Sequence, residues 1–189
     1  WTMSGLDLNN QPYRILIIED EPAQLHLLSG CLRPDFAISV AKTRKTGLEI
    51  LAGGKIDILL LDITLPDGNG FDICREVRSD KVLYGDISII FMTGHDSMDD
   101  EVHGLKLGAN DYIRKPFNYE VLKARIDLQV QLLRKTQLLA QLANLDGLTE
   151  IPNRRAFDRQ LEIEWNRAKR DCALLSLVII HIDCFKQFK

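Results

Sequence analysis

The sequence predicts an α/β fold: a doubly wound, five-stranded parallel sheet, then a long helix and the start of a second, α+β domain. Short apolar runs rich in β-branched residues alternate with amphipathic stretches over residues 13–117. Four of these runs are almost continuously apolar, which is typical of strands covered by helices on both faces. Alternation of strands and helices gives a parallel sheet with right-handed crossovers. After residue 117 the alternation stops, which indicates a different kind of structure.

Five strands and four helices are expected in the first domain. Apolar runs predict strands over residues 14–18, 36–41, 56–61, 87–92 and 111–113. Amphipathic patterns between them predict helices over residues 22–32, 43–51, 70–78 and 98–107. Sheets of this kind bind ligands beside the carboxyl ends of the strands, so functional residues are expected there.

One long helix is expected over residues 118–145, because this stretch contains neither Gly nor Pro and Asn118 can cap its start. Residues along it repeat with the 4-3-4-3 spacing of a coiled-coil seam: Leu128, Leu132, Lys135, Leu139 and Leu142. We therefore expect a homodimer that forms through this seam. The alternative is a helix that packs only on its own domain.

A second domain begins after this helix. Asp146 and Gly147 break the helix, Asn153 can cap a new helix that runs to Arg170, and residues 173–182 are expected to form a buried strand. The predicted organisation has four parts: a flexible tail over residues 1–12, a first domain over 13–129, a linking helix over 118–145 and the beginning of a second domain over 146–189. The first part of the linking helix also belongs to the first domain, so these two ranges overlap.

Composition excludes several classes of protein. Hydrophobic residues make up 46% and charged residues 27% of the 189 positions, as in ordinary soluble domains. The longest nearly apolar run, residues 172–180, is far shorter than the roughly 18–20 residues of a membrane helix, so no membrane insertion is expected. The four cysteines form no C-x-x-C pair, which argues against disulfides and zinc and favours a reducing cytoplasm.

The first domain is acidic. Residues 1–117 carry 12 Lys and Arg against 18 Asp and Glu, a net charge of −6. An acidic domain binds nucleic acid poorly, because the phosphate backbone is itself negative. Residues 146–189 show no compact helix-turn-helix pattern, so we expect no nucleic-acid partner.

Polar residues follow the predicted strands at the edge where their carboxyl ends meet. Glu19 and Asp20 follow the first strand, Asp62 the third, Thr93 the fourth and Lys115 the fifth. Clustered carboxylates raise one another's pKa unless a cation lies among them, and their hard oxygen atoms suit Mg²⁺. Once this charge is neutralised, an Asp carboxylate can act as a nucleophile toward a phosphoryl group. The sequence therefore predicts a magnesium-dependent phosphoryl-transfer site.

Four blocks of sequence carry this site: ILIIEDEP at residues 15–22, LLDITLPDGNG at 60–70, FMTG at 91–94 and GANDYIRKPF at 108–117. Together they resemble the receiver domain of two-component response regulators, a flavodoxin-like fold, over residues 14 to 129. The resemblance implies Mg²⁺ as the cofactor and a histidine kinase or phosphotransfer protein as the phosphoryl donor. Phosphorylation would then shift a pre-existing conformational equilibrium and bias dimerisation.

The resemblance also assigns roles to individual residues. Asp62 looks like the phosphoacceptor. The implied metal ligands are Glu19, Asp20, Asp62 and the Thr64 carbonyl. Thr93 would bond a phosphoryl oxygen, Lys115 would pair with another and would precede a cis peptide bond, and Tyr112 is the aromatic residue whose rotamer changes with Thr93. Glu19 stands where the family more often has Asp, which keeps the charge and alters the fine geometry of the metal site.

The last residues resemble a different family. LDGLTEIPNRRAF at residues 145–157 and IHIDCFK at 180–186 are similar to the opening of a GGDEF domain, the catalytic unit of diguanylate cyclases. Asp183 and Lys186 match that family's motif. His181 stands at the position of a magnesium-binding Asp, and Lys189 at that of a guanine-reading Asn. A neutral imidazole is a poor ligand for Mg²⁺, so we expect His181 to be a buried strand residue with no ligand role.

Two functions of the whole protein remain open. The first is a phosphorylation-controlled cyclase that converts GTP to cyclic di-GMP. The second is a regulator whose degenerate GGDEF domain senses nucleotide or binds protein without catalysis. We expect these 189 residues alone not to be a competent cyclase, because the family's catalytic hairpin would follow residue 189.

Overall fold

The computed structural model describes residues 11–80, 84, 86–94, 98–143 and 151–178 of the chain. The chain divides into two compact units, Trp1–Gln137 and Leu138–Lys189. The predicted tail over residues 1–12 lies almost entirely outside the described residues. In the described part of the chain, no helix is long and apolar enough to cross a membrane.

The first unit is built on a five-stranded sheet in the order β2-β1-β3-β6-β7, in which every neighbouring pair runs parallel. The strands are β1 (Arg14–Ile18), β2 (Ala37–Ala41), β3 (Ile58–Asp62), β6 (Ser88–Thr93) and β7 (Asp111–Arg114). The predicted fold class is therefore confirmed. The strand order changes direction between β1 and β3, and such a reversal marks the edge where doubly wound sheets bind ligands.

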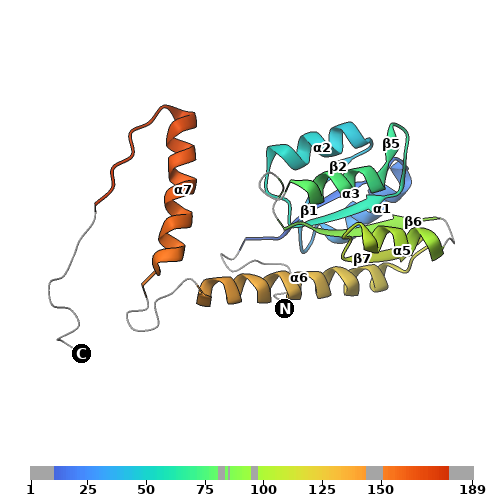
Figure 1. The fold of residues 1–189 in the computed structure, drawn as a ribbon. Coiled ribbons are helices and arrows are strands. Elements are labelled where there is room, and N and C mark those ends of the chain that lie inside the picture. Colours follow the sequence, from blue (N-terminus) through green and yellow to red (C-terminus); the bar gives the residue numbers. More distant parts are fainter. Residues whose placement is uncertain (1–10, 81–83, 85, 95–97, 144–150, 179–189) are drawn as a thin grey trace. The chain divides into compact units, whose positions relative to one another are not determined.

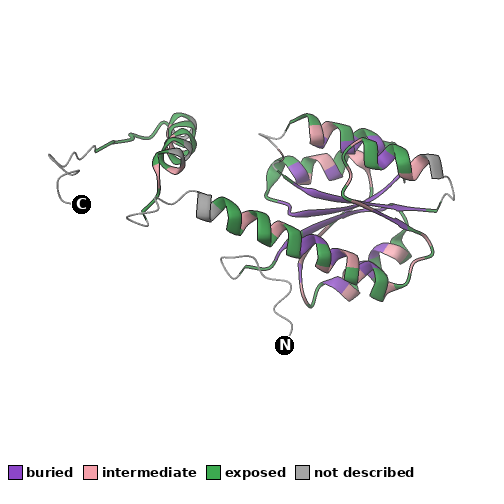
Figure 2. Cartoon of the chain, turned by 60° about the horizontal axis from the view of Figure 1, so that its bottom comes forward, coloured by how far each residue is buried: buried purple, intermediate pink, exposed green. Residues whose placement is uncertain are grey.

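Helices cover both faces of this sheet (Figure 1). They are α1 (Pro22–Leu32), α2 (Arg44–Gly53), α3 (Gly70–Ser79), α5 (Met98–Lys106) and α6 (Tyr119–Ala143). One buried cluster joins the strands to Leu28 of α1 and Ile126 of α6, and the other joins them to Leu51 of α2 and Val77 of α3. Figure 2 shows the buried strands as a layer between helices whose outer sides are exposed.

A short antiparallel hairpin, β4 (Thr64–Leu65) and β5 (Gly68–Asn69), lies between β3 and α3. It is missing from the sequence-based prediction, because two-residue strands are too short to show a hydrophobic period. A hydrogen bond from the Gly70 amide to the Ile63 carbonyl, 2.8 Å long, closes its base. Gly70 is required there, because a Cβ atom would lie 2.3 Å from the carbonyl oxygen of Asp62.

The predicted long helix is present as α6, and Asn118 caps it by accepting a hydrogen bond from the Glu120 amide at 2.7 Å. The helix carries two apolar stripes. One is buried against the sheet and contains Leu122, Ile126 and Val130. The other belongs to the predicted seam and is 49–67% exposed at Leu128, Leu132 and Leu139. Packing on its own domain thus leaves the seam uncovered, and the expected dimer stays a prediction.

The second unit contains α7 (Arg154–Asp171), close to the predicted bounds of that helix. Asn153 caps it as predicted, since its carboxamide oxygen accepts a hydrogen bond from the Ala156 amide at 3.1 Å. The side chain of Leu142, the last predicted seam residue, lies outside the described residues.

The predicted buried strand over residues 173–182 is wrong for residues 173–178. These residues form no regular structure (Figure 1) and are exposed (Figure 2). A strand is stabilised by hydrogen bonds to a neighbouring strand, and none of the described residues supplies one beside this segment. The rest of the predicted strand lies outside the described residues, as do His181, Asp183, Lys186 and Lys189.

Candidate functional site

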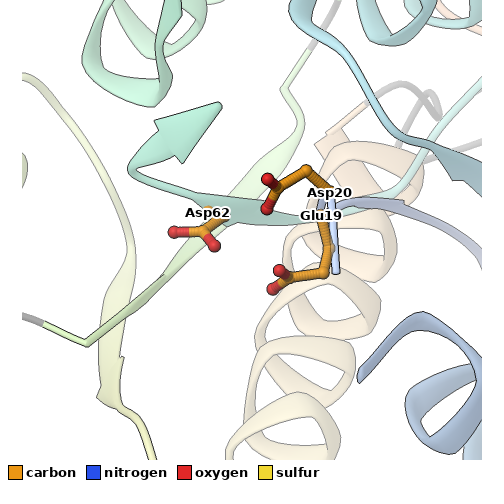
Figure 3. Close-up of side chains that lie close together, drawn as sticks. All are labelled: Glu19, Asp20 and Asp62. Atoms are coloured by element: carbon orange, nitrogen blue, oxygen red, sulfur yellow. The ribbon is translucent and has the colours of Figure 1, made fainter. Parts of the chain in front are cut away.

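The carboxyl ends of two central strands bring the predicted acidic residues together. Glu19 and Asp20 directly follow β1, and Asp62 is the last residue of β3. The two strands are neighbours, with Ile18 opposite Leu61. Figure 3 shows the three carboxylates gathered at this edge of the sheet. Residues that are more than 40 positions apart in the sequence thus meet at one point.

The three carboxylates form a candidate metal site. Oxygen atoms of Glu19, Asp20 and Asp62 lie within 4.8 Å of one another. Glu19 and Asp62 are buried, whereas Asp20 is exposed. Mg²⁺ prefers oxygen ligands and usually keeps several water molecules, which a cluster open to solvent on one side permits. The residues present therefore fit the predicted ion.

Lys115 contacts two of these carboxylates. Its ammonium group donates to Glu19 Oε2 at 2.5 Å and to Asp62 Oδ2 at 2.6 Å, and its side chain is only 13% exposed. The peptide bond between Lys115 and Pro116 is cis, as the resemblance implied. One ammonium group against three carboxylates leaves a formal charge of −2, which a divalent cation would balance.

Burial and the ion pairs shift the pKa values of Glu19 and Lys115. Burial raises the pKa of Glu19, the hydrogen bond from Lys115 lowers it and the charge of Asp62 raises it, and the net shift is upward. Burial by itself would lower the pKa of Lys115, but the hydrogen bonds to Asp62 and Glu19 and the negative charges of these two residues together outweigh this effect and raise it. Lys115 is therefore a fixed cation at neutral pH.

Thr64 contacts the Asp62 carboxylate through its backbone. Its amide donates to Asp62 Oδ1 at 3.2 Å, while Lys115 holds the other oxygen. The orientation of the Asp62 carboxylate is thus determined on both sides. The role of the Thr64 carbonyl as a metal ligand stays a prediction.

Thr93 lies in β6, the strand next to the one that carries Asp62, and Tyr112 lies in β7, the strand after it. Thr93 ends β6 and is 1% exposed, and its carbonyl accepts a hydrogen bond from the Lys115 amide at 2.6 Å. The Tyr112 ring in β7 is also buried, and its hydroxyl has no hydrogen-bond partner among the described residues. Both side chains are buried in the domain, and their roles as a switch stay predictions.

Two residues of the β4–β5 hairpin region have structural roles that the sequence analysis did not predict. Asp67 accepts hydrogen bonds from the amides of Arg44 and Lys45, at 2.7 and 3.0 Å, at the start of α2. Asn69 caps α3 by accepting a hydrogen bond from the Phe71 amide at 2.8 Å. An Asn just before a helix is a recognisable cap signal. The partners of Asp67 lie 23 and 22 residues away, so no local pattern indicates them.

An apolar groove adjoins the acidic site. It has a volume of about 570 Å³ and is lined by Ala23, Gln24, Leu27, Leu28, Gly94, Lys115, Pro116 and Phe117. Leu27 on α1 is 55% exposed. Because Lys115 both lines the groove and bonds to Asp62, a group that enters the groove would lie next to the acidic site.

Comparison with known proteins identifies two family matches. Residues 15–127 match the response regulator receiver domain, and residues 143–189 match the diguanylate cyclase GGDEF domain. A probable cyclic di-GMP phosphodiesterase of Vibrio cholerae serotype O1 is 35% identical over 125 residues, which cover 66% of this chain and 28% of that protein. The transcriptional regulatory protein DltR of Streptococcus agalactiae serotype III is 37% identical over 129 residues, covering 66% and 56%. The chain therefore spans only about a quarter to a half of the length of these relatives.

Solved structures share the fold of the first unit. A CheY-like response regulator receiver domain protein from Methanospirillum hungatei JF-1 aligns with a TM-score of 0.61 at 29% identity, covering 66% of this chain and 98% of the other. The BeF3-activated receiver domain of Klebsiella pneumoniae RstA aligns with a TM-score of 0.57 at 32% identity, covering 62% and 97%. With the receiver match extending over more than half of its residues, the chain belongs to the response regulator receiver family, and its C-terminal residues match part of a GGDEF domain.

Proposed function

We propose that this chain is the phosphorylatable part of a response regulator in cyclic di-GMP signalling, with Asp62 as the phosphoacceptor. The observation that carries the proposal is the Asp62 carboxylate, which is held between Lys115 and the Thr64 amide beside two further acidic residues. Membership of the receiver family supports this role. The GGDEF match, and a relative named as a probable cyclic di-GMP phosphodiesterase, support the signalling system.

Mg²⁺ would be held by Glu19, Asp20, Asp62 and the Thr64 carbonyl. When bound, the ion would offset the negative charge that otherwise repels a phosphoryl group from this cluster. Lys115 supplies a further positive charge, and its burial makes the interaction with an incoming anion stronger than it would be in water.

In the proposed reaction, a carboxylate oxygen of Asp62 forms a bond to phosphorus while the bond between phosphorus and the donor's imidazole nitrogen breaks. The product is an acyl phosphate on Asp62. Lys115 would pair with one phosphoryl oxygen, and the Thr93 hydroxyl would bond another. Both residues lie at the strand ends next to Asp62, so only short movements are needed.

The phosphoryl donor would be a histidine kinase or phosphotransfer protein. The apolar groove beside Lys115 supports this choice, because it offers exposed apolar surface on α1 directly next to the site of transfer. A protein donor that covers the groove would bring its phosphorylated imidazole close to Asp62 and exclude water.

The signal would leave the site through Thr93 and Tyr112. A phosphoryl group on Asp62 would draw the Thr93 hydroxyl toward it, which changes the packing around the buried Tyr112 ring on the adjacent strand. Helix α6, which follows β7, would carry the change onward. Two copies of the chain would then join through the exposed seam of Leu128, Leu132 and Leu139.

The proposed arrangement is a receiver over residues 13–129, a linking helix over 118–145 and a GGDEF output domain from residue 146 onward, in a reducing cytoplasm. The output is either a diguanylate cyclase or, because His181 and Lys189 depart from the family's motif, a degenerate module that binds without catalysis. Incubation of the full-length protein with GTP and Mg²⁺ under phosphorylating conditions separates the two. Formation of cyclic di-GMP supports the cyclase, and its absence supports the binding module.

The central test replaces Asp62 with Asn and measures phosphoryl incorporation from acetyl phosphate in the presence of Mg²⁺ by intact-protein mass spectrometry. We expect the wild-type protein to take up one phosphoryl group and Asp62→Asn to take up none, because an amide cannot form the acyl phosphate. Asp72→Asn is the matched control, since Asp72 is an exposed carboxylate on α3 paired with Arg75. Equal labelling of Asp62→Asn and wild type would refute the proposal.

A further inference from the structure

The carboxylate of Asp67 joins the β4–β5 hairpin to helix α2. Asp67 Oδ1 accepts a hydrogen bond from the Arg44 amide at 2.7 Å, and Oδ2 accepts one from the Lys45 amide at 3.0 Å. Hydrogen bonds from the Lys45 and Arg44 amides also lower the pKa of Asp67, so the side chain is ionised at neutral pH. Both oxygens are therefore used to link two elements that are distant in sequence.

Helix α2 has no acidic residue of its own at its start. Its first turn contains no Asp or Glu and begins instead with Arg44 and Lys45. Basic residues are unfavourable at this end, because the aligned peptide dipoles give it a partial positive charge. Thr43 caps the Thr46 amide at 3.2 Å, which leaves the two preceding amides for Asp67. Asp67 thus provides both the acceptors and the negative charge.

The other end of the same hairpin adjoins the acidic site. β4 begins at Thr64, two residues after Asp62, and the Thr64 amide donates to the Asp62 carboxylate. The hydrogen bond between Gly70 and Ile63 closes the base of the hairpin. At its tip, Gly68 lies so close to α2 that a Cβ atom would be 2.9 Å from Cδ of Arg44. The segment is therefore held at its base by its own backbone and at its tip by α2.

We propose that Asp67 is a positioning residue for the metal and phosphoryl site, because its bonds to α2 hold the hairpin so that Thr64 keeps its place beside Asp62. The inference rests on the proposed function, since it concerns the same site. A backbone ligand cannot reorient without moving the chain on either side of it. The hairpin must therefore be fixed for Thr64 to offer its carbonyl at the right point.

A purely structural role for Asp67 makes a different prediction. If Asp67 only stabilised α2, its removal would lower the melting temperature and leave the affinity for Mg²⁺ unchanged. Thr43→Ala is the matched comparison, because it weakens the same helix end and leaves the hairpin attached. Asp72→Asn controls for the loss of one negative charge, since Asp72 lines the same surface groove as Asp67.

The test measures Mg²⁺ binding to the whole chain by isothermal titration calorimetry, with the melting temperature recorded for each variant. We expect Asp67→Ala to weaken Mg²⁺ affinity by about tenfold, as loss of a group that supports a metal ligand commonly does. Asp67→Asn should weaken it by about threefold, because the amide oxygen can still accept one of the two hydrogen bonds. Thr43→Ala and Asp72→Asn should stay within about twofold of the wild type, although Thr43→Ala lowers the melting temperature.

Two results would overturn the inference while the proposed function stands. One is an unchanged Mg²⁺ affinity in both Asp67 variants, and the other is the same loss of affinity in Thr43→Ala as in the Asp67 variants. Failure of the wild-type protein to bind Mg²⁺ would overturn the inference and the proposed function together. If Asp67→Ala does not fold, the comparison of Asp67→Asn with Thr43→Ala decides the question.

Discussion

The two units of the chain bury their apolar residues to very different extents, although both have regular apolar patterns. In β3, Leu59 and its neighbours are 0% exposed, because helices cover both faces of the sheet. In the second unit, Trp165 is 62% exposed and Leu174 is fully exposed. An apolar pattern stabilises a fold only where another surface covers it, since the favourable free energy comes from area removed from water.

Ion pairs in the two units also differ in how far they are exposed to water. Lys115 of the first unit, whose side chain is only 13% exposed, lies between two carboxylates. Arg154 of the second unit lies 3.8 Å from Asp158 on an exposed helix surface, with 94% of its side chain accessible. A pair in water is worth little, whereas a buried charge that loses its partner is costly.

The largest expected effect comes from a matched pair of core and surface truncations. Leu59→Ala should lower the free energy of unfolding by about 2–5 kcal/mol, because it leaves a cavity in the sheet core. Leu174→Ala should change it by less than about 0.5 kcal/mol. Urea unfolding followed by circular dichroism measures both. If both variants lost the same free energy of unfolding, Leu174 would be covered in solution and the two units would not differ in burial.

An intermediate effect is expected from the charged residues. Without Mg²⁺ at pH 7, Lys115→Met should cost about 1–3 kcal/mol by leaving buried carboxylates unpaired, whereas Arg154→Met should cost under about 0.5 kcal/mol. The pKa of Lys115 is raised above its ordinary 10.5 in the folded protein, so its contribution is complete below pH 10.5 and is lost as the pH rises through the folded-state pKa. Thermal unfolding at pH 7 therefore measures this contribution in full.

The same Lys115 variant gives a second readout of the acidic site. Added Mg²⁺ should raise the melting temperature of Lys115→Met more than that of the wild type, because the ion replaces the missing positive charge. An identical increase in both proteins would mean that Lys115 and the metal do not share the same carboxylates.

The smallest expected effect on folding concerns the exposed stripe of α6. Leu132→Lys should change the free energy of unfolding of the monomer by less than about 0.5 kcal/mol, because Leu132 is 49% exposed in the single chain. In light scattering, beryllofluoride with Mg²⁺ should increase the dimer fraction of the wild type and not that of Leu132→Lys. Gln131→Lys, an exposed change beside the seam, is the control. A dimer fraction that is the same in all three proteins would exclude this interface.

Local patterns were sufficient to predict most of the first unit. The helix over residues 22–32 and four of the five strands carry strong apolar signals. A parallel sheet brings the carboxyl ends of its strands together at one edge, whatever the path of the loops. The meeting of Glu19, Asp20, Asp62 and Lys115 could therefore be inferred from the sequence alone. The β4–β5 hairpin could not, because its strands have only two residues each.

Long-range contacts were not accessible to the same reasoning. Asp67 bonds to amides 22 and 23 residues away, and nothing in the local sequence distinguishes it from an ordinary turn carboxylate. For residues 173–178, the sequence instead predicted a strand that the structure does not contain. Their largely apolar composition predicted a strand, but a strand also needs a neighbour, and no described residue provides one.

The amino-acid sequence by itself determined the order of strands and helices and the chemical character of the site, because period and residue type act locally. Tertiary structure decided which carboxylate oxygens Lys115 holds, how Asp67 fastens the hairpin to α2, and which stripe of α6 stays exposed. These features depend on distances between segments far apart in the chain. Only the packed sheet and its helices establish those distances.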